Sequence, residues 1–424
     1  SRAVNDTTYL VRVFYGLDLY DQEPEIEGDQ ITFTDLPLGE AWVFIARGTV
    51  GADGFFYPTA SGDIEVTIVG GDNDAVHITL ADSPFQWSAD LKGSSIVGLT
   101  ELDGSVYAST NRLLYKGTYT NNTFATVSGP EVPAGVEVNS LSVGTTYDGG
   151  AYTDQVWVNG SWSSATGGGI MPWTASNTLD NGFSSGFEPA AALEIIDSGA
   201  FVVGDGLAVF FQRDGGLGGV FLATPTEYAK DKADWPWIVD EINLGELLAD
   251  MVENPDDLIL DFEVNSSTAY VVSTLITAKV SESIISASGA SAEDLLNSDH
   301  VAFAPELGSP IVDLDLDETN SRIYMATANG LYVGSTSTAS GKFLADGTEA
   351  TAVAGTLGYS IKRAVSSQRG SYVAFITKRG DDPDLLSLIN VATSGIQTYR
   401  TLEGLPGEDI QSLVWLDDSV LAIG

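Results

Sequence analysis

The chain has 424 residues, of which 59 are acidic and 18 are basic, so its formal net charge is −41. It contains no cysteine and only two histidines, which excludes disulfide frameworks, thiolate nucleophiles, zinc knuckles and multi-histidine metal sites. Such a negative chain repels nucleic-acid phosphates and anionic lipid, so we expect no nucleic-acid partner and no membrane-surface binding.

The apolar content is that of a globular protein, since 43% of the residues are hydrophobic. No apolar run reaches the length of about 18 residues that a transmembrane helix needs. The chain opens at Ser1 without a signal-peptide pattern, and we expect a mature product, for example a lipoprotein trimmed past its anchoring cysteine. Absent cysteine and high acidity favour an extracellular, cell-surface or periplasmic protein, and the acidity fits plain solubility and a saline habitat equally well.

Residues 1–82 are predicted to form a compact β-sandwich domain. Thr8–Tyr15 is rich in β-branched and aromatic residues, and Gln30–Leu36 alternates apolar with polar positions, as a half-buried strand does. Glycine-rich and Asp-rich turns separate the further strands of this domain. These further strands are Ala41–Ala46, Asp63–Ile68 and Ala75–Leu80.

The stretch from Ile31 to Leu80 contains the turn Asp35-Leu-Pro-Leu-Gly39, followed by a strand of alternating aromatic residues. In this it resembles the small prealbumin-like or carboxypeptidase-regulatory-like sandwiches that are appended to exported bacterial proteins. The resemblance implies an architecture and no activity.

Residues 83–424 repeat at intervals of about 50 residues, which is typical of β-propeller blades. In the clearest copies a buried strand, a polar turn and a second strand follow one another, as in Ser95–Thr110, Pro310–Thr327 and Asp409–Gly424. Units open near residues 96, 138, 192, 258, 311, 361 and 410. We therefore predict an all-β chain in which a sandwich precedes a seven-bladed propeller, with six or eight blades as the alternatives.

The last unit contains only two strands, so a propeller needs other residues to complete that blade. The most economical source is Phe85–Asp90, directly before the first unit. Tyr399–Asp418 also resembles the two-component regulator propeller repeat of hybrid histidine kinases, through Gly404-Leu-Pro406, Ile410 and Asp417. This resemblance supports a propeller but implies no sensor function, because no kinase or transmembrane part follows.

No catalytic motif is present: the chain lacks a nucleophile elbow, a phosphate loop with lysine and a His-Glu-x-x-His helix. We expect no cofactor. A carboxylate pair would suffice for a glycosidase or lyase, so this activity stays open. Asp313, Asp315 and Asp317 alternate along one strand, where they would meet a Ca²⁺ ion or simply form a solvated strand face.

Several other motifs have simple structural interpretations. Gly215–Gly219 is interpreted as a hairpin or loop tip and Gly380–Asp384 as an exposed turn. His77 alternates with apolar neighbours and is expected on a wet face, and His300 ends a short stretch with helical character. Both histidines are interpreted as structural. Four sequons, beginning at Asn5, Asn121, Asn159 and Asn265, raise the question of glycosylation.

Tryptophans in loop-like sequence are the candidate ligand-binding residues. Trp162 and Trp173 flank a glycine run, and Trp235 and Trp237 lie in the longest insertion of the repeat array. Exposed tryptophan presents the rigid apolar face that sugar and peptide grooves use. The alternative is that these rings pack between blades.

The function that we predict from the sequence is that of an exported, non-catalytic protein whose propeller loops bind a protein or a glycan. Two alternatives remain open. The first is a structural subunit that self-assembles into a surface layer, sheath or filament through edge strands. The second is a glycan hydrolase or lyase that uses a carboxylate pair at the central mouth of the propeller.

Overall fold

The computed structural model describes the chain in segments. These are residues 8–15, 18–20, 24–27, 30–50, 56–71, 73, 75–83, 91, 94–120, 123–148, 151–162, 170–179, 195–203, 206–213, 218–223, 242–243, 259–265, 268–273, 277–281, 301–336, 343–344, 349–379, 382–399 and 409–424. Within these segments the regular structure is strand throughout, apart from the 3-10 turn η3 (Glu318–Asn320). The all-β prediction is confirmed. No helix in these segments has the length and hydropathy that crossing a bilayer requires.

The chain divides into two compact units. Unit 1 comprises Ser1–Gly93 with Tyr399–Gly407, and unit 2 comprises Ser94–Thr398 with Glu408–Gly424. The predicted boundary near residue 82 stays a prediction in its detail, because the residues around it, 84–90, lie outside the described segments.

Unit 1 contains a five-stranded antiparallel sheet in the order β2-β1-β5-β6-β7 and a separate pair, β3-β4. The bounds are β1 Thr8–Tyr15, β2 Asp18–Tyr20, β3 Glu25–Glu27, β4 Gln30–Thr32, β5 Gly39–Val50, β6 Phe56–Ile68 and β7 Ala81–Asp82. Val11 and Val13 of β1 are buried, and their partners in β5, Ile45 and Val43, are half-buried on the same face of the sheet. Phe44 and Ala46 of β5 are buried on the opposite face, where they pair with Arg12 and Leu10. Alternation in β1 therefore marks one buried face, but both faces of the sheet carry buried side chains.

One strand expected in unit 1 is wrong. Ala75–Leu80 runs past β6 without strand pairing, and only Ala81 and Asp82 pair with it, opposite Ser61 and Ala60. His77 is exposed, as expected. The segment from Ala75 to His77 is exposed throughout, so the alternation reflects no buried face there.

Unit 2 consists of seven separate sheets among the described residues, each built from strands that follow one another in the chain. The first four sheets are β8 Gly98–Leu102, β9 Ser105–Ser109, β10 Leu114–Thr120 and β11 Thr123–Ser128; β12 Val136–Asp148, β13 Ala151–Trp162 and β14 Ile170–Trp173; β15 Ile195–Val203, β16 Gly206–Arg213, β17 Gly218–Ala223 and β18 Ile242–Asn243; and β19 Ile259–Asn265, β20 Thr268–Ser273, β21 Thr277–Ser281 and β22 Val301–Phe303. The last three are β23 Ile311–Asp317, β24 Arg322–Thr327, β25 Gly330–Ser335 and β26 Thr351–Ala352; β27 Ile361–Ser366, β28 Tyr372–Arg379, β29 Asp382–Asn390 and β30 Gly395–Tyr399; and β31 Leu413–Asp417 with β32 Val420–Ile423.

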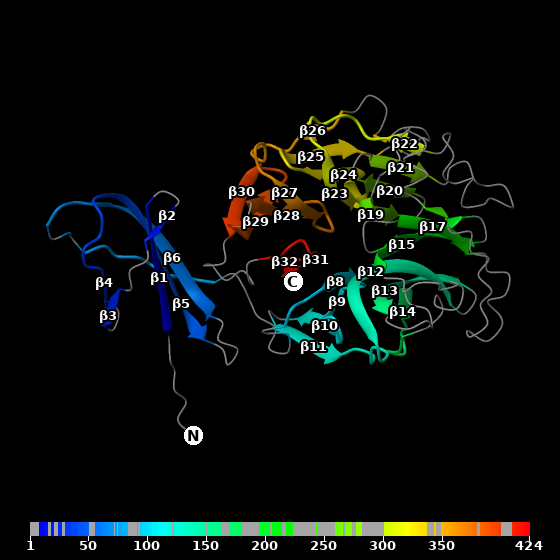
Figure 1. Cartoon of the computed structure of the whole chain (residues 1–424), viewed down its shortest axis with the longest axis horizontal. Helices are drawn as coiled ribbons and strands as arrows, with labels where there is room; N and C mark the ends of the chain where they lie inside the picture. The colour runs from blue at the N-terminus through cyan, green and yellow to red at the C-terminus, as the bar shows by residue number, and fades with distance from the viewer. Residues whose placement is uncertain are drawn as a thin grey trace, which may run out of the picture. The chain divides into compact units, whose positions relative to one another are not determined.

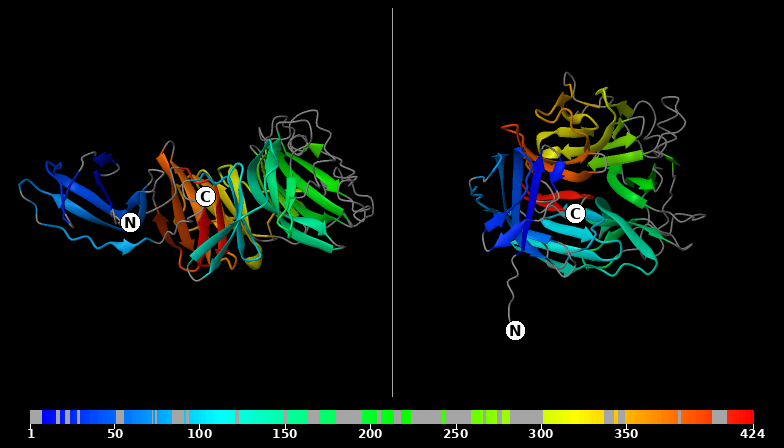
Figure 2. Two further views of the ribbon diagram at one scale, coloured as in Figure 1. Left: turned by 90° about the horizontal axis from the view of Figure 1, so that it is seen from below. Right: turned by 60° about the vertical axis from the view of Figure 1, so that its left-hand side comes forward.

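The first strands of these sheets lie innermost and contact one another in a cycle (Figure 1). Contacts run from β8 through β12, β15, β19, β23 and β27 to β31, and β31 contacts β8 again. No hydrogen-bonded ladder joins one described sheet to the next. Seen from below, most strands of unit 2 run up and down the picture, so the sheets stand side by side (Figure 2).

The predicted repeat openings coincide with these first strands to within about three residues, well inside ordinary boundary error. The second strands explain why the repeat is so apolar. All residues of β9 and of β20 are buried, as is normal for strands that are covered on both faces. Apolar side chains such as Tyr270, Leu314 and Met325 form one core between two neighbouring sheets.

The last sheet has two described strands, β31 and β32. Phe85–Asp90, which we expect to complete it, and the Gly404-Leu-Pro406 motif both lie outside the described segments. The Asp-centred turn of the same motif is described: Asp417 Oδ1 accepts hydrogen bonds from the main-chain N–H groups of Ser419 and Val420, at 2.6 and 2.9 Å.

Candidate functional site

A β-bulge recurs near the start of the first strand in five sheets of unit 2. The pairing register shifts between Val138 and Ser140 in β12, and at the equivalent position of β15, β19, β23 and β27. A bulge bends the strand and re-aims the side chain at that position. The residue after each shift is polar; we call these five residues the central polar ring, and they are Ser140, Asp197, Asp261, Asp313 and Arg363.

Carboxylates of the inner strands bind the main chain of the next sheet. Asp261 Oδ2 accepts a hydrogen bond from Leu314 N at 3.0 Å, and Asp313 Oδ2 accepts one from Ala364 N at 2.8 Å. Asp315, two residues further along β23, accepts a third from Ser366 N at 2.8 Å. An inner strand has one edge without a strand partner, and these carboxylates satisfy its N–H groups. They therefore connect adjacent sheets.

Arg363 is the cation of the central polar ring. Its Nε lies 3.6 Å from Asp313 Oδ1, and its Nη1 donates a hydrogen bond to Gln411 O at 3.0 Å, in the segment that leads into β31. Burial opposes its positive charge, but the carboxylates of Asp313, Asp261 and Asp197 outweigh this and raise the pKa of the guanidinium. Arg363 thus stays charged and offsets part of the negative charge around it.

The carboxyl groups at this centre are unusually weak acids. Burial, followed by the neighbouring charge of Asp261, raises the pKa of Asp197 to about 7. Burial also raises the pKa of Asp315 to about 7, against the hydrogen bonds from Ser366. Glu263 of β19 and Asp313 have pKa values raised well above the ordinary range for the same main reason. Near neutral pH this cluster holds protons that exposed carboxyl groups would have lost.

Asn159 of β13 is hydrogen-bonded to Ser140 of the central polar ring and to Ser198 of the next sheet. The side chain is fully buried, and its Nδ2 donates hydrogen bonds to Ser140 Oγ at 2.9 Å and Ser142 Oγ at 3.1 Å. Its Oδ1 accepts a hydrogen bond from Ser198 Oγ of β15 at 2.5 Å. The sequon at Asn159 is therefore inaccessible to glycosylation in the folded protein, and its amide links two sheets instead.

Of the four candidate tryptophans, the structure describes the side chain of Trp173. Trp173 is 5% exposed, its Nε1 donates to Asn177 Oδ1 at 3.0 Å, and its ring meets Tyr107 edge-on at 4.9 Å. This placement favours the packing alternative for Trp173. The main chain of Trp162, at the end of β13, pairs with that of Val136 in β12. Trp235 and Trp237 lie outside the described segments. Ligand binding by Trp162, Trp235 and Trp237 stays a prediction.

Two acidic segments are placed differently from the sequence-based expectation. Asp313 and Asp317 are 6% and 3% exposed, so the strand that carries them is covered by its neighbour and is not a solvated face. Asp384, expected in an exposed turn, is 2% exposed and lies 3.1 Å from Lys362 Nζ. Within the described segments, no three His, Asp or Glu residues are grouped so that they could hold a metal ion.

Gly218 pairs with Gln212, and β16 and β17 are antiparallel neighbours. Gly215, Gly216 and Leu217 lie outside the described segments, so the loop expected at Gly215–Gly219 stays a prediction. His300, Asn5 and Asn121 lie outside the described segments.

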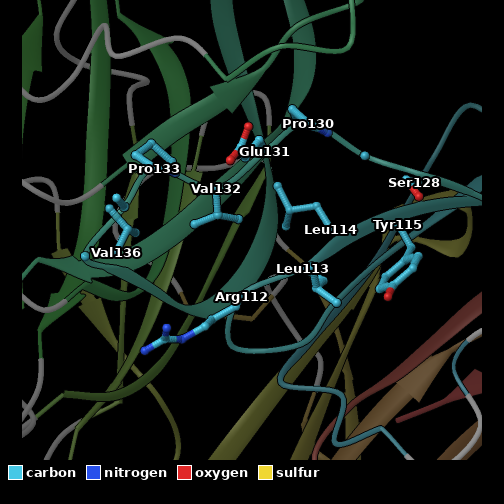
Figure 3. Close-up of a pocket in the computed structure, with 13 residues that line it drawn as sticks. Arg112, Leu113, Leu114, Tyr115, Ser128, Pro130, Glu131, Val132, Pro133 and Val136 are labelled. Atoms are coloured by element: carbon cyan, nitrogen blue, oxygen red, sulfur yellow. The ribbon is translucent and has the colours of Figure 1, made fainter.

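A surface groove lies at one end of the first sheet of unit 2 (Figure 3). Its volume is about 410 Å³, and it is open to solvent between the start of β10 and the segment that joins β11 to β12. Leu113 is 55% exposed there, and Arg112 forms an ion pair with Glu137 at 3.2 Å. The lining is mostly apolar, with Leu113, Tyr115, Pro130, Val132 and Pro133 and the charged groups of Arg112 and Glu131.

The sequence contains a signal for the ring that composition alone does not reveal. Ile195-Ile-Asp197, Ile259-Leu-Asp261 and Ile311-Val-Asp313 share an Ile-x-Asp pattern directly at a repeat opening. When the repeat units are aligned at their first strands, these three aspartates fall at the same position of the repeat. Ser140 and Arg363 break the pattern, so the whole ring required the structure.

No protein-family model matches the chain, and no curated protein matches it. Similar solved structures include Hsv2p from Kluyveromyces lactis, with 12% identity over 77% of this chain and 88% of that one at a TM-score of 0.44. Raptor from Chaetomium thermophilum is 9% identical over 77% of this chain and 26% of that one, with a TM-score of 0.45. The WD40 domain of Pan2 from Neurospora crassa is 7% identical over 80% of this chain and 82% of that one, with a TM-score of 0.40.

Proposed function

We propose that unit 2 is a seven-bladed β-propeller and that unit 1 is a β-sandwich appended to it. The cyclic order of contacts among the seven first strands supports the propeller. So does the spacing of contacts across neighbouring sheets: Asp261 and Leu314 are 53 positions apart, and Asp313 and Ala364 are 51 apart. One sheet rotated about a central axis reproduces such a spacing.

We infer that the protein is a non-catalytic binding protein that presents its propeller surface to a protein or a glycan. One observation carries this inference: the polar side chains of the inner strands are engaged in hydrogen bonds between sheets. Groups with such a structural role are poorly placed to turn over a substrate. Recognition then falls to the outer surface, where the groove beside Leu113 offers apolar area with a few charged groups.

The groove suits a ligand with an apolar or planar part. Prolines and Val132 form one wall and Leu113 with Tyr115 forms the other (Figure 3). The Arg112–Glu137 ion pair at its margin is exposed, at 71% and 55%, so it contributes orientation more than affinity. Both a peptide with an apolar side chain and a sugar face fit this description.

A glycan and peptide array on the purified full chain tests the proposal. Leu113→Glu places a charge on the groove wall and should reduce binding of the selected ligand by about tenfold or more. Leu357→Glu is the matched control, because Leu357 is 60% exposed and does not line the groove. Equal loss in both variants, or no ligand on either array, would contradict the proposal.

A second function is favoured by one specific observation, the pKa of about 7 for Asp197 and for Asp315. A carboxyl group that stays protonated near neutral pH can act as a general acid in glycoside cleavage. This reading predicts turnover of a polysaccharide panel, abolished in Asp315→Asn. Turnover that survives this variant would remove the cluster from consideration as a catalytic site.

We further propose that the protein is exported. The absence of cysteine and the net charge of −41 support an extracellular, cell-surface or periplasmic setting. Self-association through edge strands remains an alternative, although the described edge strands of the unit 1 sheet, β2 and β7, have only three and two residues.

A further inference from the structure

The charges at the centre of unit 2 are distributed unevenly. β19 contributes Asp261 and Glu263, and β23 contributes Asp313 and Asp315, so two adjacent inner strands carry four carboxyl groups in addition to Asp317 at the end of β23. β15 adds one more carboxyl group through Asp197, and Arg363 on β27 is the cation that acts on all of these strands. One guanidinium cannot neutralise five carboxylates.

At the interface between β19 and β23, the carboxyl groups of one strand therefore lie next to those of the other. We call this interface, with Asp261, Glu263, Asp313 and Asp315, the acidic seam. A hydrogen bond crosses it, from Leu314 N to Asp261 Oδ2 at 3.0 Å. Beneath it lies an apolar core shared by the two sheets, in which Tyr270 and Met325 are 1% and 0% exposed. The core holds the seam together, and ionisation of the carboxyl groups opposes it.

We propose that the acidic seam is a proton-controlled latch, which is closed while the carboxyl cluster holds protons and opens locally when those protons are lost. The proposal goes beyond ligand binding, because it concerns the unit's own opening and holds whatever the groove binds. The pKa of about 7 for Asp315 places the change near neutral pH, where small shifts in pH alter the charge of the cluster.

The groups that face the seam act on the pKa of its carboxyl groups in two opposing directions. Glu263 is affected first by burial and then by the charges of Asp261, Asp315, Asp197 and Asp313, all of which raise its pKa. Arg363, from β27, opposes this at Asp313, and the N–H groups of Ala364 and Ser366 do the same at Asp313 and Asp315. The further titratable or charged neighbours are Asp317 of β23 and Arg322 and Tyr324 of β24.

The sign of the linkage follows from these raised pKa values. Between the ordinary carboxyl range and about pH 7, the folded cluster binds more protons than the unfolded chain does. The stability that it contributes is therefore present at acidic pH and is lost as the pH rises through about 7. Loss should be local, because the repulsion is concentrated on two strands.

Hydrogen exchange of the full chain at about pH 6 and about pH 9, corrected for intrinsic amide rates, tests the latch. We expect protection in residues 259–273 and 311–327 to fall by about tenfold or more at the higher pH, with little change in residues 98–109. The double variant Glu263→Gln with Asp315→Asn carries neutral isosteres of two of the protonated groups, and its response to pH should be clearly smaller than that of the wild type, with Asp197 and Asp313 still titrating. Glu131→Gln, in the exposed groove segment, is the matched control and should respond like the wild type.

Three results would overturn the proposal: a wild-type response below about twofold, an equal response in all seven sheets, or a double variant that responds as strongly as the wild type. The wild-type exchange map decides the first two points even if the double variant does not fold. Glu263→Gln alone then replaces it, with the expectation of a reduced response.

Discussion

The side-chain amide of Gln368 donates a hydrogen bond to the carboxylate of Glu101 at 3.2 Å, although 267 positions separate the two residues. The same Nε2 donates to Leu416 O at 3.1 Å. One exposed side chain in the turn between β27 and β28 therefore connects the first sheet of unit 2 with its last. This is where the repeat array meets itself, so the contact bears directly on the proposed ring.

Replacing Gln368 by Glu should weaken this connection. The variant presents a carboxylate to Glu101 and to the carbonyl of Leu416 and removes the only donor of both hydrogen bonds. We expect a loss of about 1 kcal/mol in the free energy of unfolding, measured by urea denaturation. Hydrogen exchange should rise in β8 and in β31, the strands on either side.

Gln30→Glu is the control for this prediction, because Gln30 is exposed in unit 1 and the chemical change is the same. An equal effect of both variants would show that added negative charge, and not the lost contact, causes the change. Unchanged exchange in β8 and β31 would argue against closure through Gln368.

The repeat was readable from the sequence because inner and second strands are apolar for a local reason. Strands such as β20 are covered on both faces, so every residue of Thr268–Ser273 is buried, and a run of this kind is visible in any single sequence. The strand expected at Ala75–Leu80 shows the limit of that reasoning. Its alternation is as regular, but no neighbouring strand pairs with it before Ala81. Strand pairing depends on partners that are distant in the chain.

Lys362 anchors the start of the last sheet. Its Nζ lies 3.1 Å from Asp384 Oδ2 and 2.6 Å from Asp409 Oδ1, and it donates to Ile410 O at 3.0 Å. Asp384 is fully buried, and its Oδ2 also accepts a hydrogen bond from Ile410 N at 3.0 Å. Lys362→Met should lower the free energy of unfolding by about 2–3 kcal/mol, because it leaves this buried carboxylate without its closest cation.

Arg112→Met is the matched control for the loss of a cation. Arg112 and Glu137 are 71% and 55% exposed, and such pairs contribute about 0–1 kcal/mol. The two variants are compared by thermal and urea denaturation at one ionic strength. Similar losses in both would mean that Lys378, 3.6 Å from Asp384 Oδ1, takes over the role of Lys362.

Gly144 in β12 is required by the neighbouring indole. A Cβ at this position would collide with the ring of Trp157, which is 0% exposed and cannot move aside. Gly144→Ala should therefore cost about 1–3 kcal/mol, the usual cost of overpacking a core. Gly70→Ala is the control, because a Cβ there meets nothing within 4 Å. Differential scanning calorimetry should show a lower Tm for the first variant alone, and a neutral Gly144→Ala would contradict this packing.

The central cluster was only partly predictable, for a physical reason. The sequence places Asp313, Asp315 and Asp317 on one face of a strand, but it cannot show which sheet covers that face. The hydrogen bonds of Asp313 and Asp315 to β27 depend on residues about 50 positions away, one repeat further along. The same holds for Asp384, whose sequence context is that of a turn and whose partner is Lys362. Charge in a sequence indicates exposure until a partner from another element is known.

Asp417 should show a pH dependence opposite in sign to that of the central cluster. Hydrogen bonds from the Ser419 hydroxyl and the Ser419 and Val420 N–H groups lower the pKa of its carboxyl group. The stability that the ionised Asp417 carboxylate contributes to the fold is therefore present at neutral pH and is lost as the pH falls below about 4. Asp417→Ala should lower the urea midpoint at neutral pH, and the difference from the wild type should shrink on acidification. Glu349→Ala, at another exposed carboxylate, should change little at either pH, and a constant difference for Asp417→Ala would contradict the role of its ionised form.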